Sequence, residues 1–385
     1  MMKRTLIYLL CLLLPVPALA IRLKHSPYLQ NVTDTEATIV WVADKMSVGW
    51  VELAPDDGSH FYQTERPRYW DSRDGIKRED SVHVVKLTGL KPGTRYRYRV
   101  YAQEVLSHRD YRVHYGDIAA TDVWSRQPLS FVTSSVNSPS TTFAVVNDIH
   151  EDNAKLEKLL GHCDMKQTDF VIYNGDMVSH FTSEDQLFKG FMDTSIKLFA
   201  AEKPMYYVRG NHETRRTFAP NFHRYFSPAE PNLYYTVRRG PVFFVMLDTG
   251  EDKPDTDLEY GGITDYDHYR DVQAEWLKEV LASEAYRTAP YKVVVGHIPP
   301  GNDWHGDCEV EQKFMSLLRQ AAPDLMLCGH LHEYIHHKAT ADTPFPIIVN
   351  SNAAVLKITA DGNRMEVEAT DTEGKQIDRF TVNKR

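Results

Sequence analysis

The sequence predicts a short leader followed by two folded domains, an all-β sandwich and then an α/β domain. Up to about residue 133 the chain consists of short segments rich in β-branched and aromatic residues, separated by turn clusters. After Thr142 it changes to a repeating strand, loop and helix pattern. The length of 385 residues also exceeds what one hydrophobic core usually serves.

The first twenty residues have the pattern of a cleaved signal peptide. Lys3 and Arg4 precede an apolar run at 5–14, and Ala18, Leu19 and Ala20 form the small-x-small pattern that signal peptidase reads. A membrane anchor is the alternative, but the run is too short to span a bilayer and two prolines follow it. We expect cleavage after Ala20, export to a periplasm or the medium, and no stable membrane insertion of the mature protein.

Composition argues against nucleic acid as a partner. The formal net charge is −9, from 53 acidic and 44 basic residues, and an acidic balance does not attract a polyanion. Three cysteines follow the leader, Cys163, Cys308 and Cys328, so at most one disulfide can form within the chain, and its pairing stays open. The sequence makes no prediction about the oligomeric state.

Residues 21–135 are predicted to form the sandwich. Segments 38–42, 82–85 and 95–100 have the length and composition of strands, and 95–100 alternates polar and apolar side chains as a half-buried strand does. Segment 87–96 has the form of a tyrosine corner, in which a tyrosine hydroxyl bonds to upstream backbone. The segment resembles the fibronectin type III domain that precedes the catalytic domain of purple acid phosphatases.

Residues 136–385 are predicted to form the α/β domain, and a serine-rich linker lies at 134–141. Buried strands are expected at 142–147, 169–174, 205–209, 242–248, 291–296 and 324–328, and helices near 152–162, 184–199, 268–286 and 309–320. The strand-like segments 347–349, 354–359, 365–369 and 379–382 are expected to complete a second sheet.

Side chains that can bind metals directly follow five of the predicted strands. The motifs are Asp148-Ile149-His150, Gly175-Asp176, Gly210-Asn211-His212-Glu213, Gly296-His297 and Gly329-His330-Leu331-His332. Ligand sites in α/β sheets lie outside the carboxyl ends of the strands. We therefore expect these oxygen and imidazole donors to surround one point.

In order and in type, the five motifs resemble the signature blocks of the calcineurin-like metallophosphoesterases, D-x-H, G-D, G-N-H-[DE], G-H and G-H-x-H. The resemblance covers the chain from residue 142 onward, and the sandwich extends it over nearly all of the mature chain. It implies a four-layer α/β domain, with two β-sheets flanked by helices, and a two-metal centre that hydrolyses phosphate esters.

The resemblance also implies a role for each motif residue. The first metal would be held by Asp148, His150, Asp176 and His332, and the second by Asp176, Asn211, His297 and His330, with Asp176 bridging. A shared carboxylate makes two neighbouring cations tolerable. Mixed imidazole and carboxylate donors suit two divalent or trivalent ions, Fe, Zn or Mn.

Catalytic roles are expected for Asp176, His212 and Glu213. His212 would protonate the leaving group or stabilise the transition state, and Glu213 would orient the His212 ring. One motif departs from the purple acid phosphatases, whose second block is G-D-x-x-Y and whose tyrosinate binds ferric iron and gives the colour. This chain has Ser179 in that position, and its His150 is a donor that the purple enzymes lack, so we predict a colourless enzyme.

Substrate contacts are expected from Asn211, His212 and the loops at 298–308 and 252–267, the first of which carries Trp304 and His305. Trp304 either stacks on the leaving group or packs as a loop anchor.

Three further polar residues lie near the motifs, Arg215, Arg216 and Asp248. Arg215 and Arg216 either hold substrate phosphate or form a solvated pair. Asp248 is expected in a structural turn or behind the ligands rather than on a metal.

The predicted function is hydrolysis of small phosphate monoesters by in-line attack of a metal-bound hydroxide. Phosphodiester hydrolysis is the alternative, because the same kind of centre supports both reactions. An alternative from another class is an exported binding or adhesion protein with an inert phosphatase domain. The complete set of seven ligands argues against that alternative.

Overall fold

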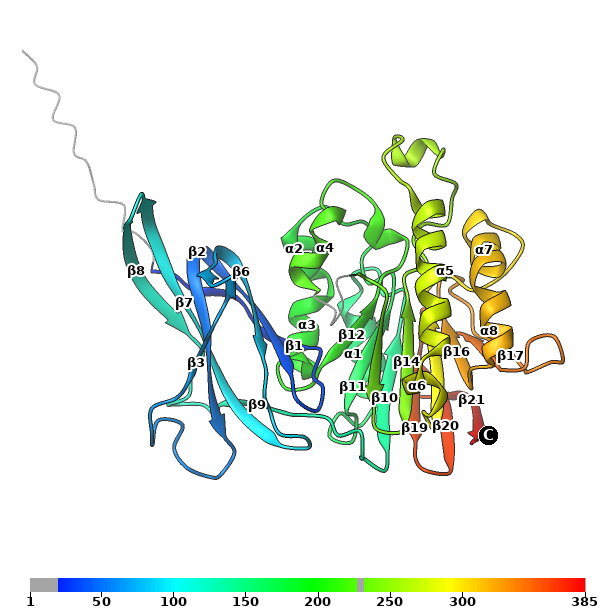
Figure 1. The fold of residues 1–385 in the computed structure, drawn as a ribbon, viewed down its shortest axis with the longest axis horizontal. Coiled ribbons are helices and arrows are strands. Elements are labelled where there is room, and N and C mark those ends of the chain that lie inside the picture. The colour runs from blue at the N-terminus through cyan, green and yellow to red at the C-terminus, as the bar shows by residue number, and fades with distance from the viewer. Residues whose placement is uncertain (1–19, 227–231, 385) are drawn as a thin grey trace, which may run out of the picture.

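The computed structural model describes residues 20–226 and 232–384, so the predicted leader lies outside the described residues except for Ala20. Figure 1 shows two parts, with the N-terminal strands on one side and the layered α/β elements on the other. The predicted fold class is confirmed. Across the two described ranges, no helix is long and apolar enough to cross a bilayer.

The N-terminal part is built from strands around one long central strand. The strands are β1 (Leu23–Gln30), β2 (Ala37–Pro55), β3 (Arg68–Trp70), β4 (Ser72–Arg73), β5 (Ile76–Lys77), β6 (Glu79–Leu87), β7 (Arg95–Arg109), β8 (Arg112–Ala120) and β9 (Leu129–Val132). The first half of β2 pairs with β1 and β6, and its second half pairs with β3 and β7. The core of the sandwich contains side chains from both halves of β2 and from β7. Trp41 lies in the first half of β2, Val51 in the second half and Val100 in β7, and all three belong to one buried cluster.

The predicted tyrosine corner is present at the start of β7. The backbone N–H of Lys91 donates to the Tyr96 hydroxyl at 2.9 Å. The expected alternation along 95–100 is also present, with one exception. Arg97 is only 8% exposed, because its guanidinium Nε donates to the carbonyl of Pro55 at 2.8 Å.

The first sheet of the α/β part has the order β21-β20-β19-β10-β11-β12. Its strands are β10 (Thr141–Val146), β11 (Phe170–Asn174), β12 (Met205–Val208), β19 (Ala354–Ala360), β20 (Arg364–Asp371) and β21 (Gln376–Asn383). β10, β11 and β12 are parallel, and β19 pairs antiparallel with β10. Gln30 of β1 pairs with Met205 of β12, so this sheet continues into the N-terminal part.

The second sheet has the order β13-β14-β15-β16-β18-β17. Its strands are β13 (Tyr235–Arg239), β14 (Val242–Leu247), β15 (Tyr291–Gly296), β16 (Leu325–Cys328), β17 (Ile335–His337) and β18 (Ile347–Val349). The expectation that all four C-terminal segments complete a second sheet is therefore wrong for three of them. Only β18 joins it, because β19 instead covers the edge of β10, where an unpaired buried strand would leave backbone groups without partners.

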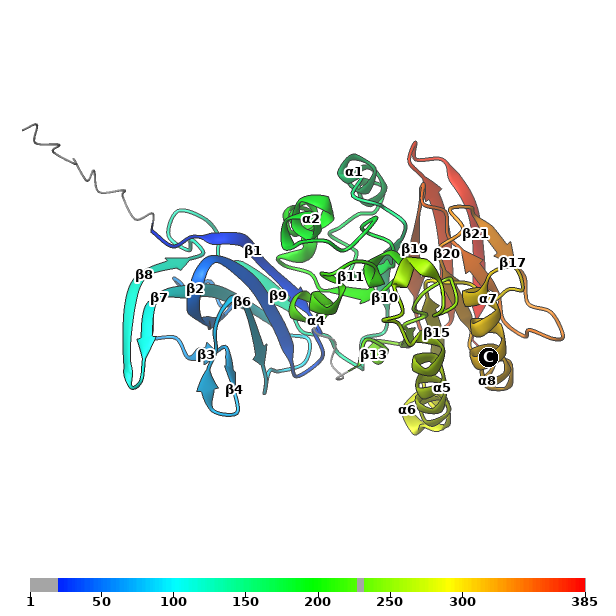
Figure 2. The same cartoon turned by 90° about the horizontal axis from the view of Figure 1, so that it is seen from above.

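Helices cover the outer faces of the two sheets. They are α1 (Asn153–Gly161), α2 (Glu184–Leu187), α3 (Asp193–Ser195), α4 (Phe222–Tyr225), α5 (Tyr266–Ala282), α6 (Glu284–Arg287), α7 (His305–Val310) and α8 (Ser316–Ala321), with π-helical segments at Phe188–Met192, Ile196–Ala200 and Glu311–Met315 and short 3₁₀ segments at His212–Thr214, Ala219–Asn221 and Leu258–Tyr260. Figure 2 shows α1 and α2 on one side of the sheets and α5 and α8 on the other. One apolar cluster lies between the first sheet and its helices, a second between the two sheets, and a third between the second sheet and its helices. This is the predicted four-layer order.

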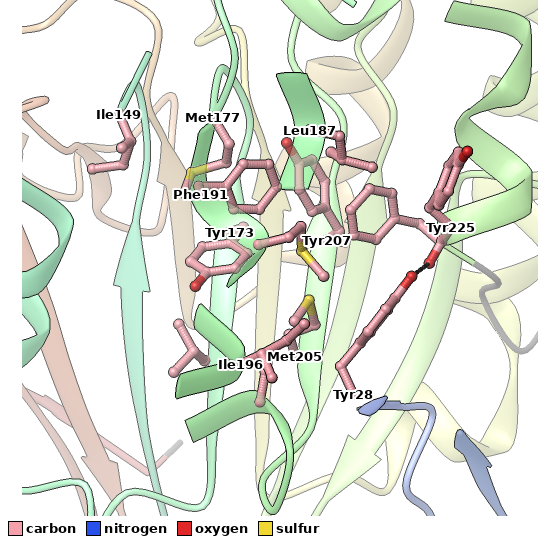
Figure 3. Close-up of a cluster of buried hydrophobic side chains, with 14 of the residues drawn as sticks. Tyr28, Ile149, Tyr173, Met177, Leu187, Phe191, Ile196, Met205, Tyr207 and Tyr225 are labelled. Atoms are coloured by element: carbon pink, nitrogen blue, oxygen red, sulfur yellow. Dashed lines mark hydrogen bonds between the residues drawn. The ribbon is translucent and has the colours of Figure 1, made fainter. Parts of the chain in front are cut away.

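The apolar cluster under α1 and α2 also receives a side chain from the N-terminal part. Figure 3 shows Tyr28 from β1 beside Met205, with its hydroxyl donating to the carbonyl of Tyr225 at 2.8 Å. The cysteines Cys163, Cys308 and Cys328 are all free thiols, so no disulfide contributes to either part.

Candidate metal centre

The five motifs meet at the carboxyl ends of neighbouring strands. Asp148 follows β10, Asp176 follows β11 and Asn211 follows β12 in the first sheet, while His297 follows β15 and His330 follows β16 in the second. The loops from both sheets therefore converge at one edge of the two-sheet stack. The side chains form two adjacent groups of possible ligands.

The first group consists of Asp148, His150 and His332, whose ligand atoms lie within 4.8 Å of one another. His332 Nε2 lies 3.1 Å from Asp148 Oδ1 and 3.3 Å from His150 Nε2. Ligand atoms that bind the same small cation lie about 2 Å from it, and therefore about 3 Å from one another. The observed distances have this size.

The second group consists of Asp176, His297 and His330. His297 Nε2 lies 3.1 Å from Asp176 Oδ2, and the ring is held in this direction because its Nδ1 donates to the carbonyl of Asn174 at 2.7 Å. The amide of Asn211 joins the group, since the amide atom that faces it lies 3.2 Å from His330 Nδ1.

Asp176 lies between the two groups. Its carboxylate belongs to the second group and also to a set with His150 and His212. His297 Nε2, from the second group, is 3.9 Å from Asp148 Oδ1, from the first. This is the position that a bridging carboxylate needs.

The backbone at the centre is in an uncommon conformation. Asp148, His150, Asp176, His330 and His332 have φ values of +53°, +48°, +54°, +73° and +58°. Non-glycine residues rarely adopt positive φ, because each instance costs about 1–3 kcal/mol and persists only where the surrounding structure imposes it. Five of the seven predicted ligands thus have strained backbone, a pattern that is typical of functional sites.

Two motif glycines are explained by close approach. A Cβ at Gly175, whose φ is +82°, would lie 2.3 Å from His297 Nδ1, and a Cβ at Gly210 would lie 2.2 Å from Asp176 Oδ1. Any larger residue would displace a predicted ligand, so these positions require glycine.

The carboxylates and imidazoles at the centre shift one another's pKa values. Burial alone would lower the pKa of His297, but the carboxylates of Asp176 and Asp148 raise it to about 10. Burial likewise would raise the pKa of Asp176, and His297 lowers it below its ordinary value. His330 has a pKa lowered to about 4 by burial and by His297, so it stays a neutral donor.

The hydrogen-bonding states of Asp148 and Asn211 indicate a cation at the centre. Asp148 Oδ1 is buried and has no hydrogen-bond partner among the described residues. Hydrogen bonding alone would turn the Asn211 oxygen toward Arg215 Nη2, 2.9 Å away, since the facing carboxylate and imidazole atoms are acceptors. An Asn211 oxygen directed into the centre therefore requires a cation there, and the residues present fit two metal ions.

The structure places His212 beside the centre but contradicts the orienting role expected for Glu213. His212 Nε2 lies 3.8 Å from Asp176 Oδ2, and its Nδ1 lies 2.6 Å from the carbonyl oxygen of Ser179. The carboxylate of Glu213 is fully buried and accepts instead from Tyr207 and from four backbone N–H groups, those of Gly210, Asp176, Met177 and Val178. Glu213 therefore organises the loop backbone and does not hold the ring.

Arg215 is not a solvated residue. It is 8% exposed, its Nε donates to Glu251 at 3.0 Å and its Nη2 donates to Asp252 at 2.9 Å, so its charge is already paired. Arg216 is 44% exposed and 3.9 Å from Glu259. Asp248 is fully buried and accepts from Arg209 at 2.8 Å, in agreement with the expectation that it lies in a turn or behind the ligands rather than on a metal.

The two residues expected in the substrate loop lie at the start of α7. Trp304 is 52% exposed. His305 Nε2 is 2.7 Å from Asp267 Oδ1, and both belong to a separate group with Glu309. Their contact with a substrate stays a prediction.

Sequence reasoning missed several residues behind the ligands. Asn147 Nδ2 donates to Asp148 Oδ2 at 2.6 Å, and Lys155 Nζ donates to the Asp148 carbonyl at 3.0 Å. Glu151 accepts from Ser179. All three lie within seven residues of Asp148, and this proximity to a motif is the one signal that could have identified them.

The imidazoles and carboxylates gathered at the strand ends of the two sheets are the ligand types of metal-dependent hydrolases. The model of the calcineurin-like phosphoesterase family matches residues 141–334, half of the chain, and the chain belongs to that family. The model of the purple acid phosphatase N-terminal domain matches residues 25–133.

The chain is similar to known proteins over most of its length. The chain is 25% identical over 361 residues to probable purple acid phosphatase 20 of Arabidopsis thaliana, covering 85% of this chain and 73% of that protein. It is 28% identical over 293 residues to purple acid phosphatase 22 of the same plant, covering 68% and 63%. The fold is similar to a purple acid phosphatase from yellow lupin seeds, with a TM-score of 0.65, 16% identity and coverage of 93% of this chain and 74% of that chain.

Proposed function

We propose that the chain is an exported phosphoesterase that hydrolyses small phosphate monoesters at a centre of two metal ions. The observation that carries the proposal is the pair of adjacent ligand groups with Asp176 between them, in which the buried Asp148 Oδ1 accepts no hydrogen bond and faces His332 Nε2 at 3.1 Å. The family and the similarity to purple acid phosphatases support the same reaction class.

Seven side chains would hold the ions, in the arrangement Asp148, His150, Asp176 and His332 for one and Asp176, Asn211, His297 and His330 for the other. When bound, two such ions activate water for attack on phosphorus and stabilise the charge that develops on its oxygens. His212 Nε2 lies 3.8 Å from Asp176 Oδ2, and in this proposal it donates a proton to the leaving oxygen.

Hydrolysis of p-nitrophenyl phosphate and of bis(p-nitrophenyl) phosphate by the same metal-loaded preparation tests the substrate class. We expect a higher kcat/KM for the monoester, and a strong preference for the diester would overturn the monoesterase assignment. Metal content tests whether the protein is an enzyme or a binding protein. Fewer than about one equivalent after mild reconstitution would favour a binding protein with an inert domain.

Two finer elements of the proposal have their own tests. The side chain of Ser179 bonds to Glu151 at 3.0 Å, and no tyrosine stands in its position, so the iron-loaded protein should lack an intense visible charge-transfer band. Export with cleavage after Ala20 predicts a mature chain that begins at Ile21, as measured by mass spectrometry of secreted protein. A purple preparation contradicts the first element, and an uncut N-terminus the second.

A further inference from the structure

His212 is held through a chain of contacts that begins outside the motifs. Its Nδ1 lies 2.6 Å from the carbonyl oxygen of Ser179. A carbonyl oxygen only accepts, so the proton of the neutral ring is on Nδ1 and the Nε2 atom is directed toward Asp176 and His150. The orientation of the ring therefore depends on where the Ser179 peptide lies.

Glu151 fixes that peptide. The Ser179 hydroxyl donates to Glu151 Oε2 at 3.0 Å, and the Ser179 backbone N–H donates to Glu151 Oε1 at 3.3 Å. Gln186, at the end of α2, donates to the same carboxylate. Three donors on one carboxylate leave Ser179 little freedom to move.

Glu151 is itself held in place. Its φ is +63°, and its backbone N–H donates to the carbonyl of Met177 at 3.0 Å. The neighbouring helical segment approaches so closely that a Cβ at Gly190 would lie 2.9 Å from Glu151 Cγ. Glu151 thus has a strained backbone and a fixed carboxylate, and the side-chain contacts that fix this carboxylate are with Ser179 and Gln186. The residue that it holds in place is therefore Ser179.

We propose that Glu151 and Ser179 are positioning residues for His212, which they hold with Nδ1 protonated and Nε2 facing the reacting phosphate. The inference rests on the proposed function, because it assigns His212 the donation of a proton to the leaving oxygen. Ser179 thereby has a different use from the metal-binding tyrosine that stands in this position in the resembling enzymes. Held in this way, the ring donates from Nε2 only when both of its nitrogens are protonated.

Leaving-group dependence separates positioning from general structural damage. In Glu151→Ala, kcat for phenyl phosphate should fall by about 10- to 100-fold with KM within about twofold, because a misplaced donor loses much of its effect. For 2,4-dinitrophenyl phosphate, whose leaving group needs little protonation, the fall should be less than about threefold. Ser179→Ala keeps the carbonyl and should lose less than Glu151→Ala.

A double-mutant cycle tests whether the effect passes through His212. Glu151→Ala introduced into His212→Ala should change kcat by less than about twofold, since the ring it positions is absent. Glu157→Ala, on the exposed side of α1, is the matched control and should keep wild-type turnover. Equal losses for both esters, or a Glu151 effect that persists without His212, would overturn the proposal.

The tautomer of His212 provides a readout that does not depend on turnover. In the zinc-reconstituted protein labelled with ¹⁵N-histidine, the His212 signals, assigned by their loss in His212→Ala, should report a protonated Nδ1. Glu151→Ala should shift them toward a mixture of tautomers. Unchanged signals would refute the positioning role even in an active enzyme, whereas a protein that hydrolyses no ester but shows the shift would contradict only the proposed function.

Discussion

Asp176 is the side chain on which both halves of the centre depend. Asp176→Asn replaces a carboxylate oxygen with an amide group, and we expect loss of both metals and a fall in turnover by several orders of magnitude. His212→Ala should keep both metals and lose about 10²- to 10⁴-fold in rate, because it removes only a proton donor. Elemental analysis and turnover of the two variants test this difference, and equal metal loss would contradict the assigned roles.

Asp307 provides a test of electrostatics away from the metals. Burial raises the pKa of this carboxyl to about 6, so it ionises more readily in the unfolded chain than in the folded one. The resulting loss of stability is present above pH 6 and disappears as the pH falls toward 4. Asp307→Asn should therefore raise the thermal midpoint at pH 7.5 and have little effect near pH 4.

The exposed Asp342, which does not contribute to the pKa of Asp307, is the control for that comparison. Asp342→Asn should leave the midpoint nearly unchanged at both pH values. A gain for Asp307→Asn that is the same at pH 4 and pH 7.5 would show that its cause is packing and not ionisation.

At the scale of strands and helices, the site was more predictable than the sheet around it. Apolar runs such as 170–174 and 291–296 are buried on both faces, and the residue that ends each run is read directly from the sequence. Motifs at strand ends then converge because parallel strands end at one edge. The positions of the motifs thus predicted that their polar side chains would lie together, whereas the choice of seven metal ligands among them came from the resemblance to the calcineurin-like family and stays a prediction.

Strand partners were not predictable in the same way. The alternation in 365–369 indicates a half-buried strand but does not say which sheet it joins. This segment joins the first sheet because it pairs with β19, and β19 pairs with β10. Leu356 and Ile358 of β19 pack between the two sheets in that position. The role of Glu213 was missed for a similar reason, since its partners are backbone N–H groups, which every residue has.

The ends of β10 and β18 are joined by a pair of asparagines, which gives a test at this scale. Asn350 Nδ2 donates to Asn147 Oδ1 at 2.7 Å, and Asn147 Nδ2 donates to the Asn350 carbonyl at 2.9 Å and to Asp148. Asn147→Ala leaves these buried groups unpaired, so we expect unfolding free energy to fall by about 2–4 kcal/mol and metal affinity by about 10- to 100-fold.

Chemical denaturation and metal titration measure the two effects. Asn383→Ala, at the exposed end of β21, is the control and should change neither quantity by much. If Asn147→Ala lost stability but bound metal as well as the wild type, Asn147 would not orient Asp148.

At the scale of the whole molecule, the two parts are joined by buried contacts. Tyr28 Oη and Gln30 Nε2 both donate to the Tyr225 carbonyl at 2.8 Å, Tyr98 Oη donates to the Ala201 carbonyl at 2.5 Å, and the ring of His25 stacks on Phe188 at 3.7 Å between centroids. Inter-domain contacts of this kind couple unfolding when they are apolar and satisfied.

We therefore expect one cooperative thermal transition for the full chain by differential scanning calorimetry. Tyr28→Phe removes one of two donors to a buried carbonyl and should lower the midpoint without dividing the transition. Two separate transitions in the wild type would contradict the coupling of the parts.

The central claim is that residues from five strand ends hold two metal ions with Asp176 between them. Anomalous scattering from a crystal of the metal-loaded protein tests it most directly. We expect two peaks about 3.5–4 Å apart, one beside Asp148, His150 and His332 and the other beside Asn211, His297 and His330, with Asp176 in contact with both. A single peak, or peaks away from these side chains, would contradict the account.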